Sequence, residues 1–228
     1  MKTIAGIDEA GRGAIIGPLV IACVAISEDK EKSLKEIGVK DSKKLSKEKR
    51  EELYKEIERL ASNIIVIRIN ACKIDSYRKN NINLDEIEAM KIAQIIDSCE
   101  ANVVFVDSLE KNSKKFEEMI RKSLKNKNTE LIVENYLDES IPVVSAASII
   151  AKVERDKAIE DIKKFIGVDF GSGYPGDPLT VKYLEELLSS KKELPIFVRE
   201  SWITLDLLKE KIFQKSLKDF IARVPESG

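Results

Sequence analysis

The chain has 228 residues, of which 43% are hydrophobic, so it can form one sizeable domain with an appendage or two small domains. Its formal net charge of −1 excludes a uniformly basic nucleic-acid-binding protein, so an anionic polymer could bind only at a local basic patch. Because the chain contains no histidine, imidazole bases, Ser-His and Cys-His pairs and His-ligated zinc sites are also excluded.

The strand signals are short apolar segments rich in β-branched residues. They predict strands at residues 3–7, 17–27, 64–69, 103–106 and 130–134. The segment 17–27 is apolar on both faces, which is typical of a central strand. Three strands come early in the chain, and strands then alternate with helices.

Helical periodicity begins after Ser46, which can cap a helix that has Leu53, Ile57 and Leu60 on its apolar face. Further helices are predicted at about 83–98, 112–124, 143–166, 178–191 and 203–222. This order predicts an α/β fold whose five-stranded mixed sheet starts as an antiparallel meander, continues with right-handed parallel crossovers and is flanked by helices. A break at 191–197 divides the chain into a predicted main domain, 1–195, and a C-terminal helical extension, 196–228.

Acidic residues follow three of the predicted strands. Asp8 and Glu9 end the first, Asp107 ends the fourth, and Asp138 and Glu139 follow the fifth. Functional groups of open α/β sheets gather at the carboxyl ends of strands, and several carboxylates at one point require a counter-charge. An all-oxygen site suits Mg²⁺ or Mn²⁺, and such a site without histidine indicates metal-assisted displacement at phosphorus. The alternative for any single acid is a solvated turn residue.

The cellular location is predicted from what the sequence lacks. Cys23, Cys72 and Cys99 are too far apart for a CxxC motif or a disulfide framework. No segment has the pattern of a signal peptide, and no apolar run approaches the roughly 18 residues of a membrane helix. We therefore expect a soluble, cytoplasmic protein.

Together these residues resemble a known family, type 2 ribonuclease H (ribonuclease HII), and its archaeal members in particular. The matching stretches, in the family's order, are GIDEAGRG (6–13), KDSKKLS (40–46), VFVD (104–107), PVVSAASIIAKVERD (142–156) and GSGYPGDP (171–178). The resemblance implies a ribonuclease H-like catalytic domain over 1–195, followed by the helical extension. It also implies a monomer that acts in DNA replication and ribonucleotide excision repair. Such enzymes cleave the RNA strand of RNA/DNA hybrids and nick 5′ of single ribonucleotides in duplex DNA, leaving 5′-phosphate and 3′-hydroxyl ends.

Carried over by position, the resemblance implies a set of catalytic acids that hold two Mg²⁺ or Mn²⁺ ions. These acids are Asp8, Glu9, Asp107 and Asp138. Asp138 is assigned rather than Glu139 because the family's acid lies four residues before a proline, here Pro142. The chain departs from the family just before this acid, because residues 135–137 are Asn-Tyr-Leu where His-Lys-Ala is usual.

The Gly-Arg-Gly stretch is the first candidate for substrate recognition. Gly11 and Gly13 leave the main chain bare, so its N–H and C=O groups can approach a ribose 2′-hydroxyl, the atom that distinguishes RNA from DNA. Arg12 could hold the adjoining phosphate. The alternative is a tight turn with one exposed arginine.

A second set of substrate contacts is implied by the resemblance. Tyr174 corresponds to the family's tyrosine that stacks on the deoxyribose after the ribonucleotide; its alternative is a loop packing residue. Phosphate-contacting or substrate-binding positions are Ser42, Lys43, Lys44, Ser148 and Lys152. With Arg155, one turn after Lys152, they form the predicted local basic patch, and hybrid affinity should fall steeply with salt.

The C-terminal helix contains QKSLKDFI, which resembles a sliding-clamp-binding box. Gln214, Leu217, Phe220 and Ile221 match it, with Ile221 in place of the usual second aromatic residue. The alternative is an amphipathic helix that packs onto the body of the protein.

Two other functions remain open from the sequence. A junction resolvase or exonuclease could use the same acids and metals on a related fold. A catalytically inert hybrid-binding or clamp-binding module is the alternative from a different class.

Overall fold

The computed structural model describes residues 2–39, 45–108, 112–126, 128–190 and 193–221, with side chains as far as residue 214. Its centre is a five-stranded sheet in the order β3-β2-β1-β4-β5. The strands are β1 (Thr3–Ala10), β2 (Leu19–Ser27), β3 (Asn63–Ile69), β4 (Val103–Asp107) and β5 (Glu130–Glu134). β2 is antiparallel to β1 and β3, whereas β4 is parallel to β1 and β5 is parallel to β4. The predicted antiparallel start and parallel continuation of the sheet are confirmed.

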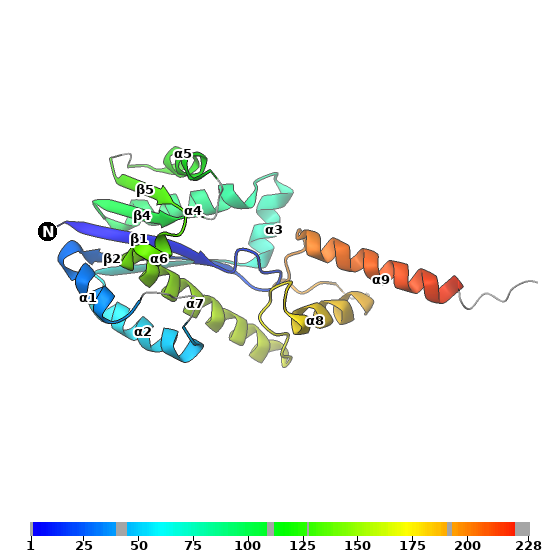
Figure 1. The fold of residues 1–228 in the computed structure, drawn as a ribbon. Coiled ribbons are helices and arrows are strands. Elements are labelled where there is room, and N and C mark those ends of the chain that lie inside the picture. Colours follow the sequence, from blue (N-terminus) through cyan, green and yellow to red (C-terminus); the bar gives the residue numbers. More distant parts are fainter. Residues whose placement is uncertain (1, 40–44, 109–111, 127, 191–192, 222–228) are drawn as a thin grey trace, which may run out of the picture.

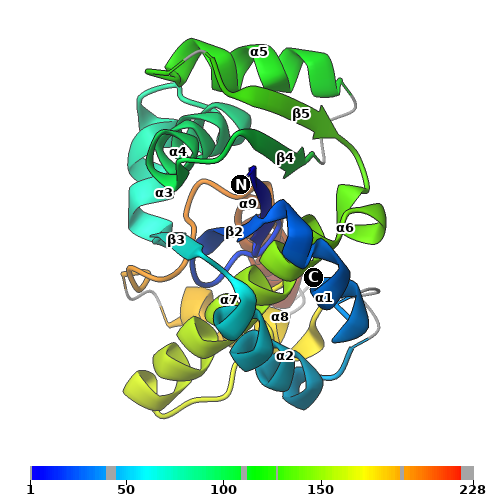
Figure 2. The same ribbon diagram turned by 90° about the vertical axis from the view of Figure 1, so that its left-hand side faces the viewer.

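Helices cover both faces of the sheet. They are η1 (Glu28–Lys30), α1 (Glu31–Glu36), α2 (Lys47–Leu60), α3 (Ala71–Lys79), α4 (Leu84–Cys99), α5 (Ser113–Ser123), α6 (Leu137–Ser140), α7 (Pro142–Ile166), α8 (Pro178–Ser189) and α9 (Ile203–Ile221). α3, α4 and α5 pack on one face, and α1, α2 and α7 pack on the other (Figure 1 and Figure 2). No helix in the part of the chain that the structure describes has both the length and the apolar character needed to cross a membrane.

The longer helices begin and end at local sequence signals. Ser46 caps α2 by accepting a hydrogen bond from the Lys49 N–H at 3.2 Å, as predicted, and Asn83 forms a capping box at the start of α4. Periodicity predicted α2, α4, α5, α7, α8 and α9. It did not reveal α1, α3 or α6, which have nine residues or fewer.

After α8 the chain returns to the body before it forms α9. Val198 pairs with Ile16 in an isolated β-bridge, and both lie in an apolar cluster with Phe170, Leu184 and Leu205. Beyond this cluster, α9 extends away from the sheet (Figure 1). The segment before α9 is thus anchored to the main body by buried apolar contacts.

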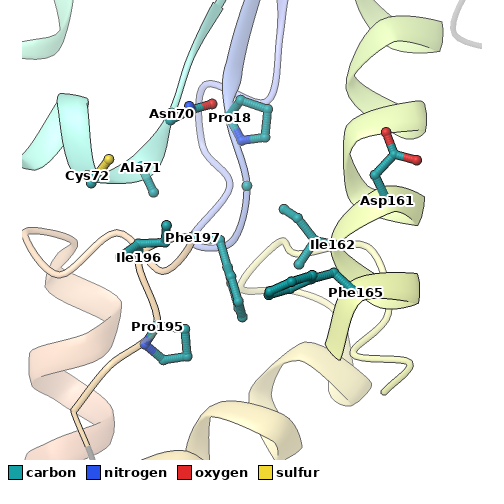
Figure 3. A pocket seen from close by; sticks show the side chains of 11 residues that line it. Pro18, Asn70, Ala71, Cys72, Asp161, Ile162, Phe165, Pro195, Ile196 and Phe197 are labelled. Atoms are coloured by element: carbon teal, nitrogen blue, oxygen red, sulfur yellow. The ribbon is translucent and has the colours of Figure 1, made fainter. Parts of the chain in front are cut away.

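A hollow of about 520 Å³ opens beside this cluster (Figure 3). The start of β2, the start of α3, the end of α7 and the segment before α9 form its walls, with Pro18, Ile162, Phe165 and Phe197 among the apolar side chains. The predicted division of the chain after residue 195 falls in this region and stays a prediction.

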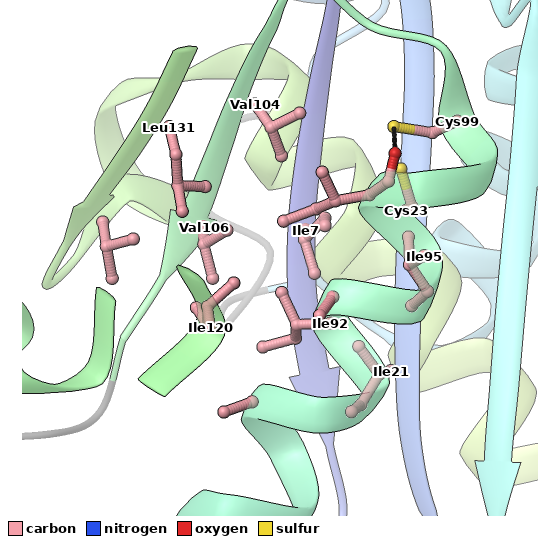
Figure 4. Close-up of a cluster of buried hydrophobic side chains, with 14 of the residues drawn as sticks. Ile7, Ile21, Cys23, Ile92, Ile95, Cys99, Val104, Val106, Ile120 and Leu131 are labelled. Atoms are coloured by element: carbon pink, nitrogen blue, oxygen red, sulfur yellow. Dashed lines mark hydrogen bonds between the residues drawn. The ribbon is translucent and has the colours of Figure 1, made fainter. Parts of the chain in front are cut away.

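Alternating strand residues decide which side chains face which helical layer. Ile7 of β1 and Val106 of β4 pack into the core that contains Ile92 of α4 (Figure 4). Successive strand residues point to opposite faces, so the residues that follow, Asp8 and Asp107, point to the face covered by α7. The core thereby sends two of the predicted acids to the same side of the sheet.

The missing side chain at Gly6 lets α7 pack directly on β1. A Cβ atom at Gly6 would lie 2.4 Å from main-chain atoms of Val143 and Val144, so any larger residue would push the start of α7 away. This close approach brings Ser148 and Lys152 of α7 to the end of β1, where Asp8 lies.

Candidate active site

Three buried aspartates meet at the carboxyl ends of β1 and β4. Asp8, Asp107 and Asp138 each offer one carboxylate oxygen, and these oxygens all lie within 4.8 Å of one another. Asp138 belongs to α6, which follows β5 and packs on α7 through the Ser145 hydroxyl, a donor to the Asp138 carbonyl at 2.6 Å. The predicted meeting of the acids from the first and fourth strands is confirmed.

Main-chain groups orient two of these carboxylates. The Leu137 N–H donates to Asp107 Oδ1 at 2.8 Å, and the Glu9 N–H donates to Asp8 Oδ1 at 2.7 Å. Leu137 stands where the family usually has alanine, and this contact needs only its backbone. The unusual residues before Asp138 therefore still hold Asp107.

The pKa of Asp8 is raised in this cluster. Burial raises the pKa of Asp8 to about 7, and the neighbouring Asp107 carboxylate adds to the increase. A hydrogen bond from the Ser148 hydroxyl and the positive charge of Lys152 oppose it, and the Lys152 ammonium also donates to Ser148 Oγ at 2.8 Å. Near neutral pH the Asp8 carboxyl therefore favours a bound proton or a nearby cation.

Glu9 lies on the other face of the sheet, because it alternates with Asp8. Among the described residues it does not join the three-aspartate group. Burial and the nearby Glu88 carboxylate of α4 raise the pKa of Glu9 well above its usual range, while Arg12 opposes this increase.

Arg12 is paired with acids of α4. Its guanidinium forms a short hydrogen-bonded ion pair with Asp85, and its Nε lies 3.4 Å from Glu88 Oε1. The sequence predicts a phosphate contact for Arg12, and no pattern near Arg12 indicates these two acids. The pairing fixes where Arg12 presents its positive charge.

The turn after β1 is held on both sides of Gly11. Gly11 has a φ of +83°, and a Cβ atom there would lie 2.6 Å from the Pro18 carbonyl oxygen, so the position requires glycine. The Gly11 N–H donates to the Tyr174 hydroxyl at 3.1 Å, and the Gly11 carbonyl accepts from Arg199 at 2.6 Å. Gly13 differs, because a Cβ atom there would have no heavy atom within 4 Å in the described structure.

A hollow of about 380 Å³ joins this turn to α2 and α7. Its lining consists of Glu9, Ala10, Gly11, Arg12, Gly13, Arg50, Lys152, Arg155, Asp156 and Tyr174. Four of these side chains are basic, so the chain carries a local basic patch despite its net charge of −1. The hollow brings together most of the predicted substrate-binding residues.

Tyr174 is fixed in this hollow by Arg155. The Arg155 guanidinium stacks on the tyrosine ring, 4.4 Å from its centroid, and donates to the Ser172 carbonyl. Arg155 is almost completely buried, so its guanidinium helps to form the recognition loop as well as the basic patch.

Two further arginines of this region have no signal in the sequence. Arg50 of α2 lines the hollow and pairs with Asp156 at 2.9 Å. Arg199 is completely buried and lies 188 residues from Gly11, to whose carbonyl it donates. Neither belongs to a motif, and only spatial proximity reveals them.

Several predicted residues fall outside the description. Ser42, Lys43 and Lys44 lie outside the described residues, as do the side chains of Leu217, Phe220 and Ile221. Gln214 is an exposed residue of α9. The predicted roles of all these residues stay predictions.

Comparison with known proteins identifies the family and agrees with the fold. The Ribonuclease HII family model matches residues 5–205. A Ribonuclease HII of Methanococcus maripaludis is 46% identical over 221 residues, which cover 93% of this chain and 92% of that protein.

Two solved structures are similar over nearly their whole length. Ribonuclease H2 of Pyrococcus horikoshii has a TM-score of 0.83 and 38% identity, over 93% of this chain and 99% of that one. The structure of the PCNA:RNase HII complex of Archaeoglobus fulgidus has a TM-score of 0.80 and 40% identity, over 88% of this chain and 95% of that one. The chain therefore belongs to the ribonuclease HII family of metal-dependent endonucleases, which hydrolyse phosphodiester bonds.

Proposed function

We propose that this chain cleaves the RNA strand of RNA/DNA hybrids and nicks 5′ of single ribonucleotides embedded in duplex DNA, leaving 5′-phosphate and 3′-hydroxyl ends. One observation carries the proposal: the cluster of three aspartates and the Gly11–Gly13 turn lie together at the end of β1. Chemistry and recognition of a 2′-hydroxyl are then separated by only a few residues. This closeness couples cleavage to the presence of a ribonucleotide.

The donor set fits hard divalent cations. The aspartates offer three converging oxygens, and burial together with the neighbouring Asp107 carboxylate raises the pKa of Asp8, so an added positive charge is favourable there. Asp8, Asp107 and Asp138 would hold the ions, with Glu9 contributing from the end of β1. Two bound Mg²⁺ or Mn²⁺ ions would supply an activated water and stabilise the leaving oxygen.

The chain's own residues orient the substrate. Arg12, already directed by Asp85 and Glu88, faces one phosphate, while Lys152 lies on the α7 side of the same hollow. The Tyr174 ring, held flat by its cation–π contact with Arg155, packs on the sugar that follows the ribonucleotide. Such contacts would bring the scissile phosphate beside the acids.

A cleavage assay tests the proposal. Two duplexes of identical sequence, one all-DNA and one with a single ribonucleotide, are incubated with the protein in Mg²⁺, in Mn²⁺ and in EDTA. We expect a metal-dependent nick only in the second duplex, 5′ of the ribonucleotide. Equal cutting of both duplexes would instead indicate a resolvase or exonuclease, and no cutting in either metal would indicate an inert module.

We also infer that α9 binds a sliding clamp. The inference is supported by the Archaeoglobus fulgidus relative, whose structure is that of a complex with PCNA, and by the exposed position of Gln214 on a helix that extends from the body. A pull-down with the clamp should lose the protein on the double change Leu217→Ala and Phe220→Ala. Unchanged capture would exclude this role.

A further inference from the structure

We infer that Arg199 is a positioning residue that fixes the main chain around Gly11 and Arg12 in the shape that reads a 2′-hydroxyl. This inference rests on the proposed function. Arg199 does not line the hollow, but its guanidinium contacts the Gly11 and Arg12 carbonyls, so part of the preference for a ribonucleotide depends on a side chain outside the hollow.

The geometry of Arg199 is the first argument. Its guanidinium donates three hydrogen bonds, all to carbonyl oxygens of the segment after β1: Nη2 to Gly11 at 2.6 Å, Nη1 to Arg12 at 2.8 Å and Nε to Gly17 at 3.1 Å. The three accepting carbonyls therefore span seven residues of one loop, Gly11 to Gly17. A single side chain sets the spacing of three carbonyl groups.

The chemistry of the side chain is the second argument. The planar guanidinium has donors in a rigid fork, which fits several carbonyls at once, whereas a lysine ammonium acts as one compact point charge. Arg199 is completely buried, and a buried cation is tolerated only where its donors are satisfied. The burial of this charge makes any other loop conformation unfavourable.

Arg199 is itself held firmly. Its N–H donates to the Ile15 carbonyl at 2.9 Å, and its guanidinium stacks on Trp202, 4.7 Å from the ring centroid. The next two residues, Glu200 and Ser201, donate their N–H groups to the buried Asp75 carboxylate at 2.9 and 3.0 Å. Residues 11–17 are therefore hydrogen-bonded to a segment, residues 199–201, that is itself held by hydrogen bonds to the buried Asp75 carboxylate.

The hydrogen bonds from Arg199 orient the peptide groups of the turn. The Gly11 N–H is directed to Tyr174 and the Gly11 carbonyl to Arg199, so the peptide on each side of Gly11 cannot rotate without breaking one of these hydrogen bonds. The outer side of the turn, at Gly13, has open space for a sugar. Loss of the Arg199 hydrogen bonds should therefore reduce the preference for a ribonucleotide more than the overall affinity for the duplex.

The test measures discrimination. In an Asp107→Asn background, which prevents cleavage, fluorescence anisotropy gives the affinity for a duplex with one ribonucleotide and for the same duplex in all-DNA form. Arg199→Gln should reduce the preference for the ribonucleotide by about tenfold, and Arg199→Lys should retain part of it. Affinity for the all-DNA duplex, and its salt dependence, should not change.

Leu205→Ala is the matched control, because Leu205 is buried in the neighbouring apolar cluster and its side chain has no donor for the Gly11 and Arg12 carbonyls. It should lower the melting temperature and leave the preference intact. An unchanged preference in Arg199→Gln would overturn the inference, as would a failure of both Arg199 variants to fold. A parent protein without any preference would instead refute the proposed function.

Discussion

Asp8 and Asp75 are both buried aspartates, 7% and 5% exposed, but their surroundings are opposite in kind. Asp75 accepts three hydrogen bonds, from the N–H groups of Glu200 and Ser201 and from the Ser201 hydroxyl at 2.6 Å. Asp8 instead lies with two other carboxylates, and the pKa of Asp8 is raised to about 7.

The difference separates structure from chemistry. A buried charge whose donors are complete stabilises the segment around it, as Asp75 does for the residues that hold Arg199. A buried charge that lacks a counter-charge costs stability and is retained where a ligand will supply that charge. Substitution of either aspartate tests this difference.

The largest expected effect is on catalysis. Asp107→Asn should reduce cleavage by roughly a thousandfold or more, because the amide binds a hard cation poorly but keeps an acceptor for the Leu137 N–H. Nicking rates on the single-ribonucleotide duplex measure the loss. Asp97→Asn, an acid-to-amide change on α4 at a residue that accepts from the Lys125 N–H, should cleave normally. Retained turnover in Asp107→Asn would remove this acid from the mechanism.

The second effect is on stability. Asp75→Ala leaves the Glu200 and Ser201 donors without their acceptor, which should lower the free energy of unfolding by about 2–4 kcal/mol. Urea denaturation followed by circular dichroism measures the change. A loss below about 0.5 kcal/mol would mean that water replaces the carboxylate easily, and the comparison with Asp8 would fail.

The third effect has the opposite sign. Because the folded pKa of Asp8, about 7, lies above its ordinary value of 3.8, the folded state binds more protons between these values. The stability that the raised pKa of Asp8 contributes is present at low pH and is lost as the pH rises through about 7. Asp8→Asn should therefore stabilise the metal-free protein by roughly 1–3 kcal/mol at pH 8.

Urea denaturation in EDTA at pH 8 and at pH 5 tests this sign. At pH 5 the advantage of Asp8→Asn should shrink, and Mg²⁺ at pH 8 should stabilise the parent protein selectively. Equal stability of the two proteins at both pH values would show that the acid cluster is not strained.

The smallest effect concerns a single cation. Lys152→Gln should weaken hybrid binding a few-fold and reduce the slope of log affinity against log salt by about 1, if Lys152 contacts one phosphate. Anisotropy titrations at several salt concentrations give both values. Lys182→Gln, at an exposed lysine of α8, should leave the slope unchanged. A flat salt response of the parent protein would contradict the basic patch itself.

Much of the fold could be predicted because its signals are local. The apolar run of β2 and the Ser46 cap of α2 act within a few residues, and both predictions are confirmed. Short α6 carries no comparable period, because Tyr136, at a φ of +64°, starts it and Ile141 ends it within four residues. Its contribution of Asp138 to the site was implied only by resemblance.

The candidate site could be predicted only in part. The positions of Asp8 and Asp107 follow from strand ends, but the separation of Glu9 from the other acids depends on which face α7 covers. The acids that orient Arg12 come from α4, and no pattern near Arg12 indicates them.

The amino-acid sequence by itself determined the order of the strands and the longer helices, the acids at the strand ends and the glycine-flanked turn after β1, because these depend on periodicity, caps and single residue types. Only the tertiary structure decided that three aspartates share one point and that Arg199 braces Gly11. The reason is that the pKa and the energy of a buried charged group depend on its neighbours in space, and those neighbours come from segments far apart in the chain.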